Sequence, residues 1–75
     1  MEYYYITFKI YDLDTSKAFR AFVATQLNDI EIINTAGAVK KMYVCMTEQC
    51  KRNVLALDYV QLIVKDSHVM LKMEK

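Results

Sequence analysis

The chain begins with MEYYYITFKIYD, residues 1–12, its most regular segment. Alternation and enrichment in Tyr, Ile, Thr and Phe predict a β-strand over Glu2–Tyr11. Alternate residues of a strand point to opposite faces of the sheet. One face receives an apolar set: Tyr4, Ile6, Phe8 and Ile10. The other, nominally solvent-facing, receives three tyrosines with a threonine and a lysine: Tyr3, Tyr5, Tyr11, Thr7 and Lys9.

An amphipathic helix is predicted next. The segment DLDTSK offers Asp14, Thr15 or Ser16 as the N-cap residue. The helix ends near Asn28, and its buried side has the i, i+3, i+4, i+7, i+8 spacing of a helix: Phe19, Phe22, Val23, Gln26 and Leu27.

A hairpin follows the first helix. Two β-rich runs predict strands over Ile30–Thr35 and Val39–Met46. Gly37, the single glycine of the chain, lies between them, where a tight turn needs positive φ.

The second half of the chain predicts a helix and another strand. Thr47 is the expected N-cap, and the buried positions of this helix are Cys50, Val54 and Leu57. The β-branched run after Asp58 predicts a strand over Tyr59–Lys65, and residues 68–73 (His68–Met73) predict a short edge strand. The alternative is one helix from Glu48 to about Lys65, because short apolar runs are ambiguous in period.

This order of elements predicts an α+β fold. Two helical crossovers around one hairpin give the ferredoxin-like, split βαββαβ plan, with an extra C-terminal edge strand where residues 68–73 add to it. The length of 75 residues predicts a single domain over residues 1–75. In this plan the first and third strands are central, and both helices cover one face of an antiparallel sheet.

The opposite, open face is the expected functional surface. When the best apolar set of each strand faces the helices, the third strand buries Met42, Val44 and Met46, and the fourth buries Val60, Leu62 and Val64. The second strand buries Ile30 and Ile32. Five tyrosines then lie on the open face with lysines and apolar residues, and the predicted partner-binding set is Tyr3, Tyr5, Lys9, Tyr11, Lys41, Tyr43, Tyr59 and Ile63. Ile33, Val39 and Lys65 extend it.

This surface has three interpretations, of which the first is the prediction and the second is its main alternative. A large exposed apolar patch usually marks an interaction site, so the first is contact with a protein partner or a second copy of the chain, in an adaptor, regulator or inhibitor. The second is single-stranded nucleic acid stacked on the aromatic side chains. The segment KKMYVCM, residues 40–46, matches the RNA-recognition signature only in its lysines and Tyr43. In the third, the tyrosines only stabilise the sheet through cross-strand pairs.

Catalytic signals are few, and the expectation is a protein that is not an enzyme and holds no cofactor or metal. The run IYDLDTSK, residues 10–17, resembles the strand-end aspartate of Cas2-like and VapD-like small ribonucleases. That resemblance implies a metal-dependent nuclease using Asp12, and the competing role of this residue is in a turn or helix cap. Cys45 and Cys50 lack the spacing of a zinc site, and His68 has no evident partner.

Composition narrows the partners and the compartment. The net charge of +1 argues against affinity that depends on neutralising many phosphates. No apolar run is long enough to span a bilayer, so no membrane contact is expected. Two cysteines without a leading signal segment favour a cytoplasmic protein over a disulfide scaffold.

Overall fold

The computed structural model describes residues 1–36 and 39–66 of the chain. The expected turn at Gly37 and the expected edge strand His68–Met73 lie outside the described residues. A 3-10 turn, η1, follows the first helix, and the elements in chain order are β1 (Glu2–Phe8), α1 (Leu13–Thr25), η1 (Leu27–Asp29), β2 (Ile30–Ala36), β3 (Lys41–Met46), α2 (Glu48–Leu55) and β4 (Val60–Lys65).

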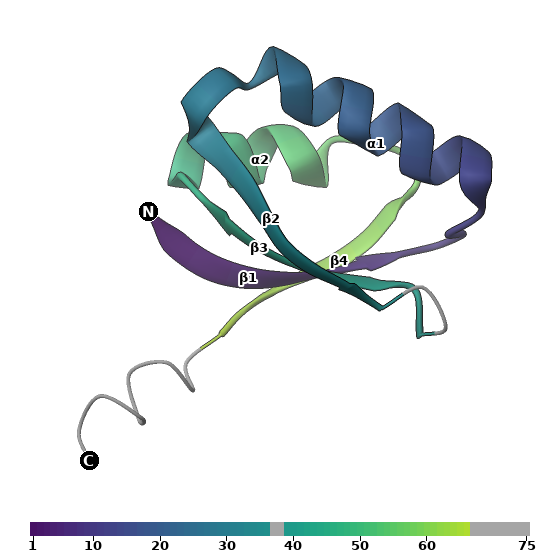
Figure 1. Cartoon of the computed structure of the whole chain (residues 1–75). Helices are drawn as coiled ribbons and strands as arrows, with labels where there is room; N and C mark the ends of the chain where they lie inside the picture. Colours follow the sequence, from purple (N-terminus) through teal and green to yellow (C-terminus); the bar gives the residue numbers. More distant parts are fainter. Residues whose placement is uncertain (37–38, 67–75) are drawn as a thin grey trace.

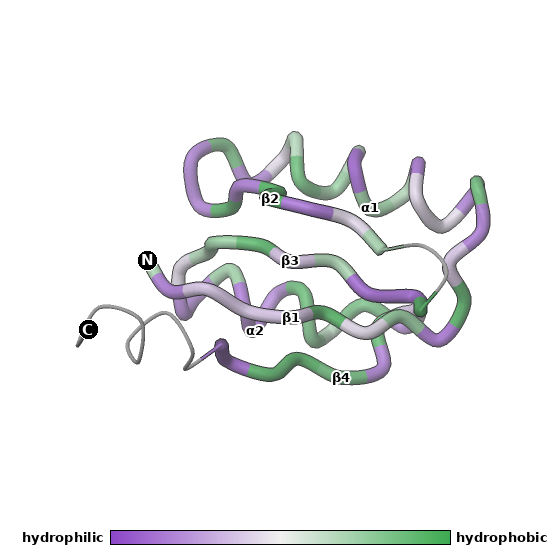
Figure 2. Tube along the Cα trace, turned by 60° about the horizontal axis from the view of Figure 1, so that its bottom comes forward, coloured by the Kyte–Doolittle hydropathy of each residue, from purple (hydrophilic) through white to green (hydrophobic). Residues whose placement is uncertain are grey.

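The four strands form one antiparallel sheet in the order β2-β3-β1-β4, with β1 and β3 in the centre. Figure 1 shows α1 and α2 on the same side of this sheet. Figure 2 brings the helix-free side forward, where the strands lie side by side. The predicted ferredoxin-like βαββαβ arrangement is therefore confirmed. No helix of the described residues is long and apolar enough to cross a membrane.

The core lies between the sheet and the helices. The central strands contribute alternate residues, as their period of two requires, and the buried set is Tyr4, Ile6, Phe8, Phe19, Ile30, Met42, Val44, Met46, Cys50, Val54 and Val60. The ring of Phe19 meets that of Phe8 edge to face at 5.3 Å, which joins α1 to β1. Phe22 and Leu57, expected to be buried, are only partly so and pack at the margin of this core.

Both helices start at a side-chain cap. The α1 cap is Asp12, not Asp14, Thr15 or Ser16 as predicted, because its Oδ1 accepts a hydrogen bond from the Thr15 backbone N–H at 2.8 Å. For α2 the prediction is confirmed, since Thr47 Oγ1 accepts one from the Cys50 N–H at 3.1 Å.

Helix α1 is shorter than predicted. It ends at Thr25, and Leu27 has a φ of 54°, in the left-handed region that ends helices. This turn directs Leu27 away from the core, so 82% of the residue is exposed where helical periodicity predicted burial.

Strand β1 is also shorter than predicted, because it ends at Phe8 rather than Tyr11. The chain leaves the sheet here to bring Asp12 to its capping position. The Tyr11 ring turns back against Phe8 at 5.2 Å, and Ile10, expected to be buried, is exposed.

Strand β4 exists, so the alternative of one long helix over Glu48–Lys65 is wrong. Its predicted register is wrong as well. Phe8 lies opposite Val60 whereas Thr7 lies opposite Leu62, so Gln61 is an extra residue in the strand. Beyond this bulge the faces are exchanged, and Leu62 and Val64 point to the open side while Ile63 packs on the core.

Candidate functional site

Three tyrosines gather on the open face of the sheet, and we call them the tyrosine cluster: Tyr3, Tyr5 and Tyr43. Tyr5 and Tyr43 are direct cross-strand partners on β1 and β3, and Tyr3 lies on the same face of β1. Tyr3 and Tyr5 remain 37% and 39% exposed, and Tyr43 is half-buried. This placement was predicted for all three.

Tyr43 is the centre of the cluster. Its ring centroid lies 4.7 Å from that of Tyr5 and 5.7 Å from that of Tyr3, and it stacks on the latter. The Tyr43 hydroxyl donates a hydrogen bond of 2.6 Å to Asp66 Oδ2, just past the end of β4. The Asp66 backbone N–H in turn donates to the Tyr3 carbonyl at 2.9 Å. The side chain of β3 is thereby tied to β1 and to the end of β4, so this ring is held in place.

The hydrogen bond to Asp66 also changes the acidity of the Tyr43 phenol. The hydrogen bond to the Asp66 carboxylate raises the pKa of Tyr43 to about 12, with desolvation adding to it. Tyr43 therefore stays protonated, as a donor, at any physiological pH. It is not a proton-transfer group near neutral pH.

Aliphatic side chains continue the surface on both sides of the cluster. On β4, Leu62 and Val64 are 51% and 48% exposed and lie opposite Thr7 and Tyr5. Figure 2 shows this edge strand as largely hydrophobic. On the other edge, Ile33 is an extra residue in β2 and is exposed as predicted.

A shallow hollow of about 250 Å³ indents the β2 side of this face. It lies between the ends of β2 and β3, and its lining includes Tyr5, Asn34, Val39, Lys41 and Tyr43. An aliphatic or aromatic group with a negatively charged end would match this mixture of apolar side chains and one ammonium group.

Three residues of the predicted partner-binding set do not lie on the open face: Tyr11, Tyr59 and Ile63. All three pack against the core. Tyr59 precedes β4 and stacks on Phe8 at 6.3 Å, and burial raises the pKa of its phenol. The bulge at Gln61 turns Ile63 inward, and the early end of β1 releases Tyr11 from the sheet. The open face thus carries three tyrosines, where five were predicted.

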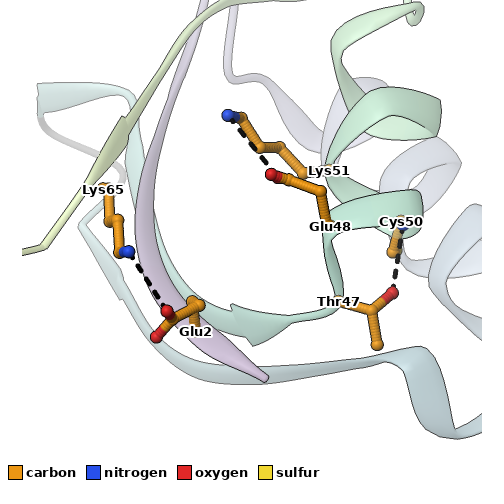
Figure 3. A network of polar contacts seen from close by, with 6 residues as sticks. All are labelled: Glu2, Thr47, Glu48, Cys50, Lys51 and Lys65. Atoms are coloured by element: carbon orange, nitrogen blue, oxygen red, sulfur yellow. Dashed lines mark hydrogen bonds and ion pairs between the residues drawn. The ribbon is translucent and has the colours of Figure 1, made fainter.

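The predicted lysine rim is also smaller than expected. Lys41 lies on the open face, opposite Thr7 of β1. Lys9 instead lines a separate hollow with Asp12 and Tyr59. Lys65 lies opposite the buried Tyr4, on the helix side, where its Nζ pairs with Glu2 at 3.1 Å (Figure 3).

The same helix side carries a second charged contact, as Figure 3 shows. Lys51 Nζ lies 3.9 Å from Glu48 on α2 and 5.6 Å from the centre of the Tyr4 ring. These charged groups lie at the end of the core and are not part of the open face.

Sequence reasoning missed Leu62, Val64 and Asp66 as parts of this surface. Strict alternation placed the first two in the core, and nothing in the local pattern marks Gln61 as an extra residue. Asp66 directly follows the predicted strand Tyr59–Lys65, and its position in the sequence does not indicate a contact with Tyr43. The available signal was that residues 62–64, LIV, are apolar at consecutive positions, so either register buries an aliphatic side chain.

Asp12 and Cys50, the other residues considered for chemistry, have structural roles. The Thr15 N–H that Asp12 caps lowers the pKa of that carboxyl. Burial raises the pKa of the Cys50 thiol, so Cys50 is a protonated core residue rather than a reactive thiolate. Within residues 1–36 and 39–66, no three His, Cys, Asp or Glu side chains gather in a group that could hold a metal ion.

Comparison of the chain with protein-family models, with curated proteins and with solved structures found no match. The topology alone defines the class of the fold, and the open face is the surface that bears on function.

Proposed function

We propose that this chain is a non-catalytic protein-interaction module that binds through the open face of its sheet. The observation that supports the proposal is the continuous apolar character of that face. Tyr3, Tyr5, Leu62 and Val64 are each between about a third and a half exposed on neighbouring strands. A solvated antiparallel sheet normally carries polar side chains there.

A protein partner suits this surface better than nucleic acid. Of the three lysines expected around the tyrosines, only Lys41 is on the face, and Glu31 opposite Cys45 adds a negative charge. Single-strand binding needs a positive groove that follows the phosphates. Tyrosine with aliphatic neighbours is instead the composition of protein interface cores. RNA stacking on the tyrosine cluster stays the alternative.

The proposed place of action is the cytoplasm. Cys45 and Cys50 are both free thiols, and Cys50 is buried. Free cysteines are typical of proteins in a reducing compartment.

Site-specific photo-crosslinking in the native cell tests the proposal. A photoreactive residue replaces Leu62 on the open face or, as the matched control, Leu13, an exposed leucine on α1. Protein adducts at position 62 that are absent at position 13 are expected. Equal labelling at both positions, or RNA adducts at position 62, would overturn the proposal.

A further inference from the structure

Two opposite charges stand at opposite ends of the open face. Glu31 of β2 lies opposite Cys45 of β3, and Lys41 is four residues earlier on β3, or about 13 Å along the strand at 3.3 Å per residue. Both residues are exposed, and neither forms an ion pair within residues 1–36 and 39–66. The face is thus a dipole along its strands, with the tyrosine cluster beside it.

Such a face is complementary to itself. From this arrangement, and resting on the proposed function above, we propose that the occupant of the open face is a second copy of the chain. The two sheets pack about a two-fold axis that lies in the contact plane and runs across the strands.

The charges select this axis. A two-fold axis across the strands exchanges their ends, so Glu31 of each copy lies over Lys41 of the other, and two identical pairs form. An axis along the strands would instead place Glu31 of β2 over the end of β4 of the partner, where the open face offers Val64 and a second carboxylate, Asp66. Only the first arrangement gives both charges a partner.

The remaining surface fits the same packing. The axis across the strands places the Glu31 end of one copy over the hollow of the other, which is lined by Lys41 and Val39. Tyr43 needs no ordering on contact, because Asp66 already holds its hydroxyl. A preorganised aromatic side chain loses less conformational entropy on binding.

The size of the face indicates the size class of the interface. Four strands spaced about 4.8 Å apart, each about 20 Å long, give a footprint of roughly 400 Å² per copy. A standard interface buries about 800 Å² per partner, so this face is at the small end for a protein contact and the dimer should be a weak one. The dimer is a reversible one that depends on concentration.

Charge reversal with mixing tests the geometry. Sedimentation equilibrium is measured from about 5 μM to 1 mM for the wild type, for E31K, for K41E and for an equimolar mixture of the two variants. Each variant alone should dimerise at least roughly tenfold more weakly, because two like-charge pairs replace two ion pairs. The mixture should recover dimerisation, since a heterodimer of E31K with K41E again has opposite charges at both pairs across the axis.

A matched double variant separates this proposal from a general charge effect. K17E reverses an exposed lysine on α1, away from the open face. The double variant E31K/K17E regains the net charge of the wild type but keeps two like-charge pairs across the axis, so it should dimerise as weakly as E31K. Dimerisation of that double variant at the wild-type level would overturn the pairing of Glu31 with Lys41, and a wild type that stays monomeric at 1 mM would overturn the dimer. A wild type that dimerises with both reversals silent would overturn the two-fold axis.

These outcomes are distinct from a failure of the proposed function. A monomeric wild type that still gives heterologous protein adducts at position 62 overturns the second copy as occupant and leaves the interaction face in place.

Discussion

At the residue scale, Tyr43 has the most specific environment on the open face. Its ring lies against Tyr3 and Tyr5, and its hydroxyl donates to Asp66. The ring contacts depend on shape, whereas the hydrogen bond depends on protonation. The two contributions can therefore be separated by pH.

We expect Tyr43→Phe to lower the melting temperature at neutral pH, because it removes the bond to Asp66 and keeps the ring. The folded-state pKa of Tyr43 is raised from an ordinary value of 10 to about 12. The stabilisation is therefore complete below pH 10 and is lost as pH rises through 12. Thermal melts of wild type and variant should converge over that window.

Tyr3→Phe is the control for this prediction. No hydrogen bond of the Tyr3 hydroxyl is present among the described residues. Its melting temperature should match that of the wild type across the same pH range. Equal losses in the two variants would contradict the role assigned to Asp66.

A second residue-scale prediction concerns the core. Phe19 is the only fully buried residue of α1, so Phe19→Ala should cost about 3–5 kcal/mol, a large part of the stability of so small a domain. Leu13→Ala, on the same helix but exposed, should cost less than about 0.5 kcal/mol. Urea denaturation of both variants checks this, and similar midpoints would mean that α1 is not packed through Phe19.

At the element scale, the bulge in β4 determines which aliphatic side chains reach the open face. Leu62→Ser should change the free energy of unfolding by less than about 0.5 kcal/mol, because Leu62 points to solvent. Ile63→Ser should cost roughly 1–3 kcal/mol, because Ile63 packs on the core. Denaturant titration of the two variants measures these free energies of unfolding. A larger cost for Leu62→Ser than for Ile63→Ser would mean that β4 has no bulge at Gln61.

The start of α1 offers the other element-scale prediction. Asp12→Asn keeps a capping oxygen and should retain the melting temperature, whereas Asp12→Ala should lower it. The Thr15 N–H lowers the pKa of Asp12 from its ordinary 3.8, so this stabilisation is present above that value and is lost as pH falls below it. Thermal melts of both variants at neutral and acidic pH check this.

The same pair of variants addresses the nuclease alternative. A purified chain that cleaves RNA or DNA with Mg²⁺, and loses this activity in the well-folded Asp12→Asn variant, would contradict a purely capping role and the binding-module proposal.

At the scale of the whole molecule, the sheet has two sides with different tasks. The helix side holds the core, so substitutions on the open face should affect binding more than folding. Tyr5→Ala should weaken dimerisation or partner binding by about 2 kcal/mol or more while the melt stays cooperative. Tyr59→Ala, on the core side, should lower the stability of the fold more than it weakens binding.

Sedimentation and thermal melts of these two variants give the comparison. If Tyr5→Ala associates as the wild type does, the tyrosine cluster only stabilises the sheet, and the proposed interface is misplaced.

The ferredoxin-like order of elements followed from local signals alone. Alternation in β1, the N-cap at Thr47 and the helical spacing of Cys50 and Val54 each reflect interactions within a few residues, which a single sequence contains. The central pairing of β1 with β3 then followed from the chirality of crossovers. Tyr3, Tyr5 and Tyr43 were placed correctly because both central strands keep strict alternation over this stretch.

The composition of the open face depended on tertiary structure. The extra residue Gln61 is defined only by its pairing with β1, and one such residue exchanges every side chain beyond it. The positions of Tyr11 and Tyr59 also depended on tertiary structure. Both rings pack on Phe8, because β1 ends before Tyr11 and β4 begins after Tyr59. Asp66 and Tyr43 are 23 residues apart in the chain. Their hydrogen bond depends on tertiary packing, so no local sequence pattern predicts it.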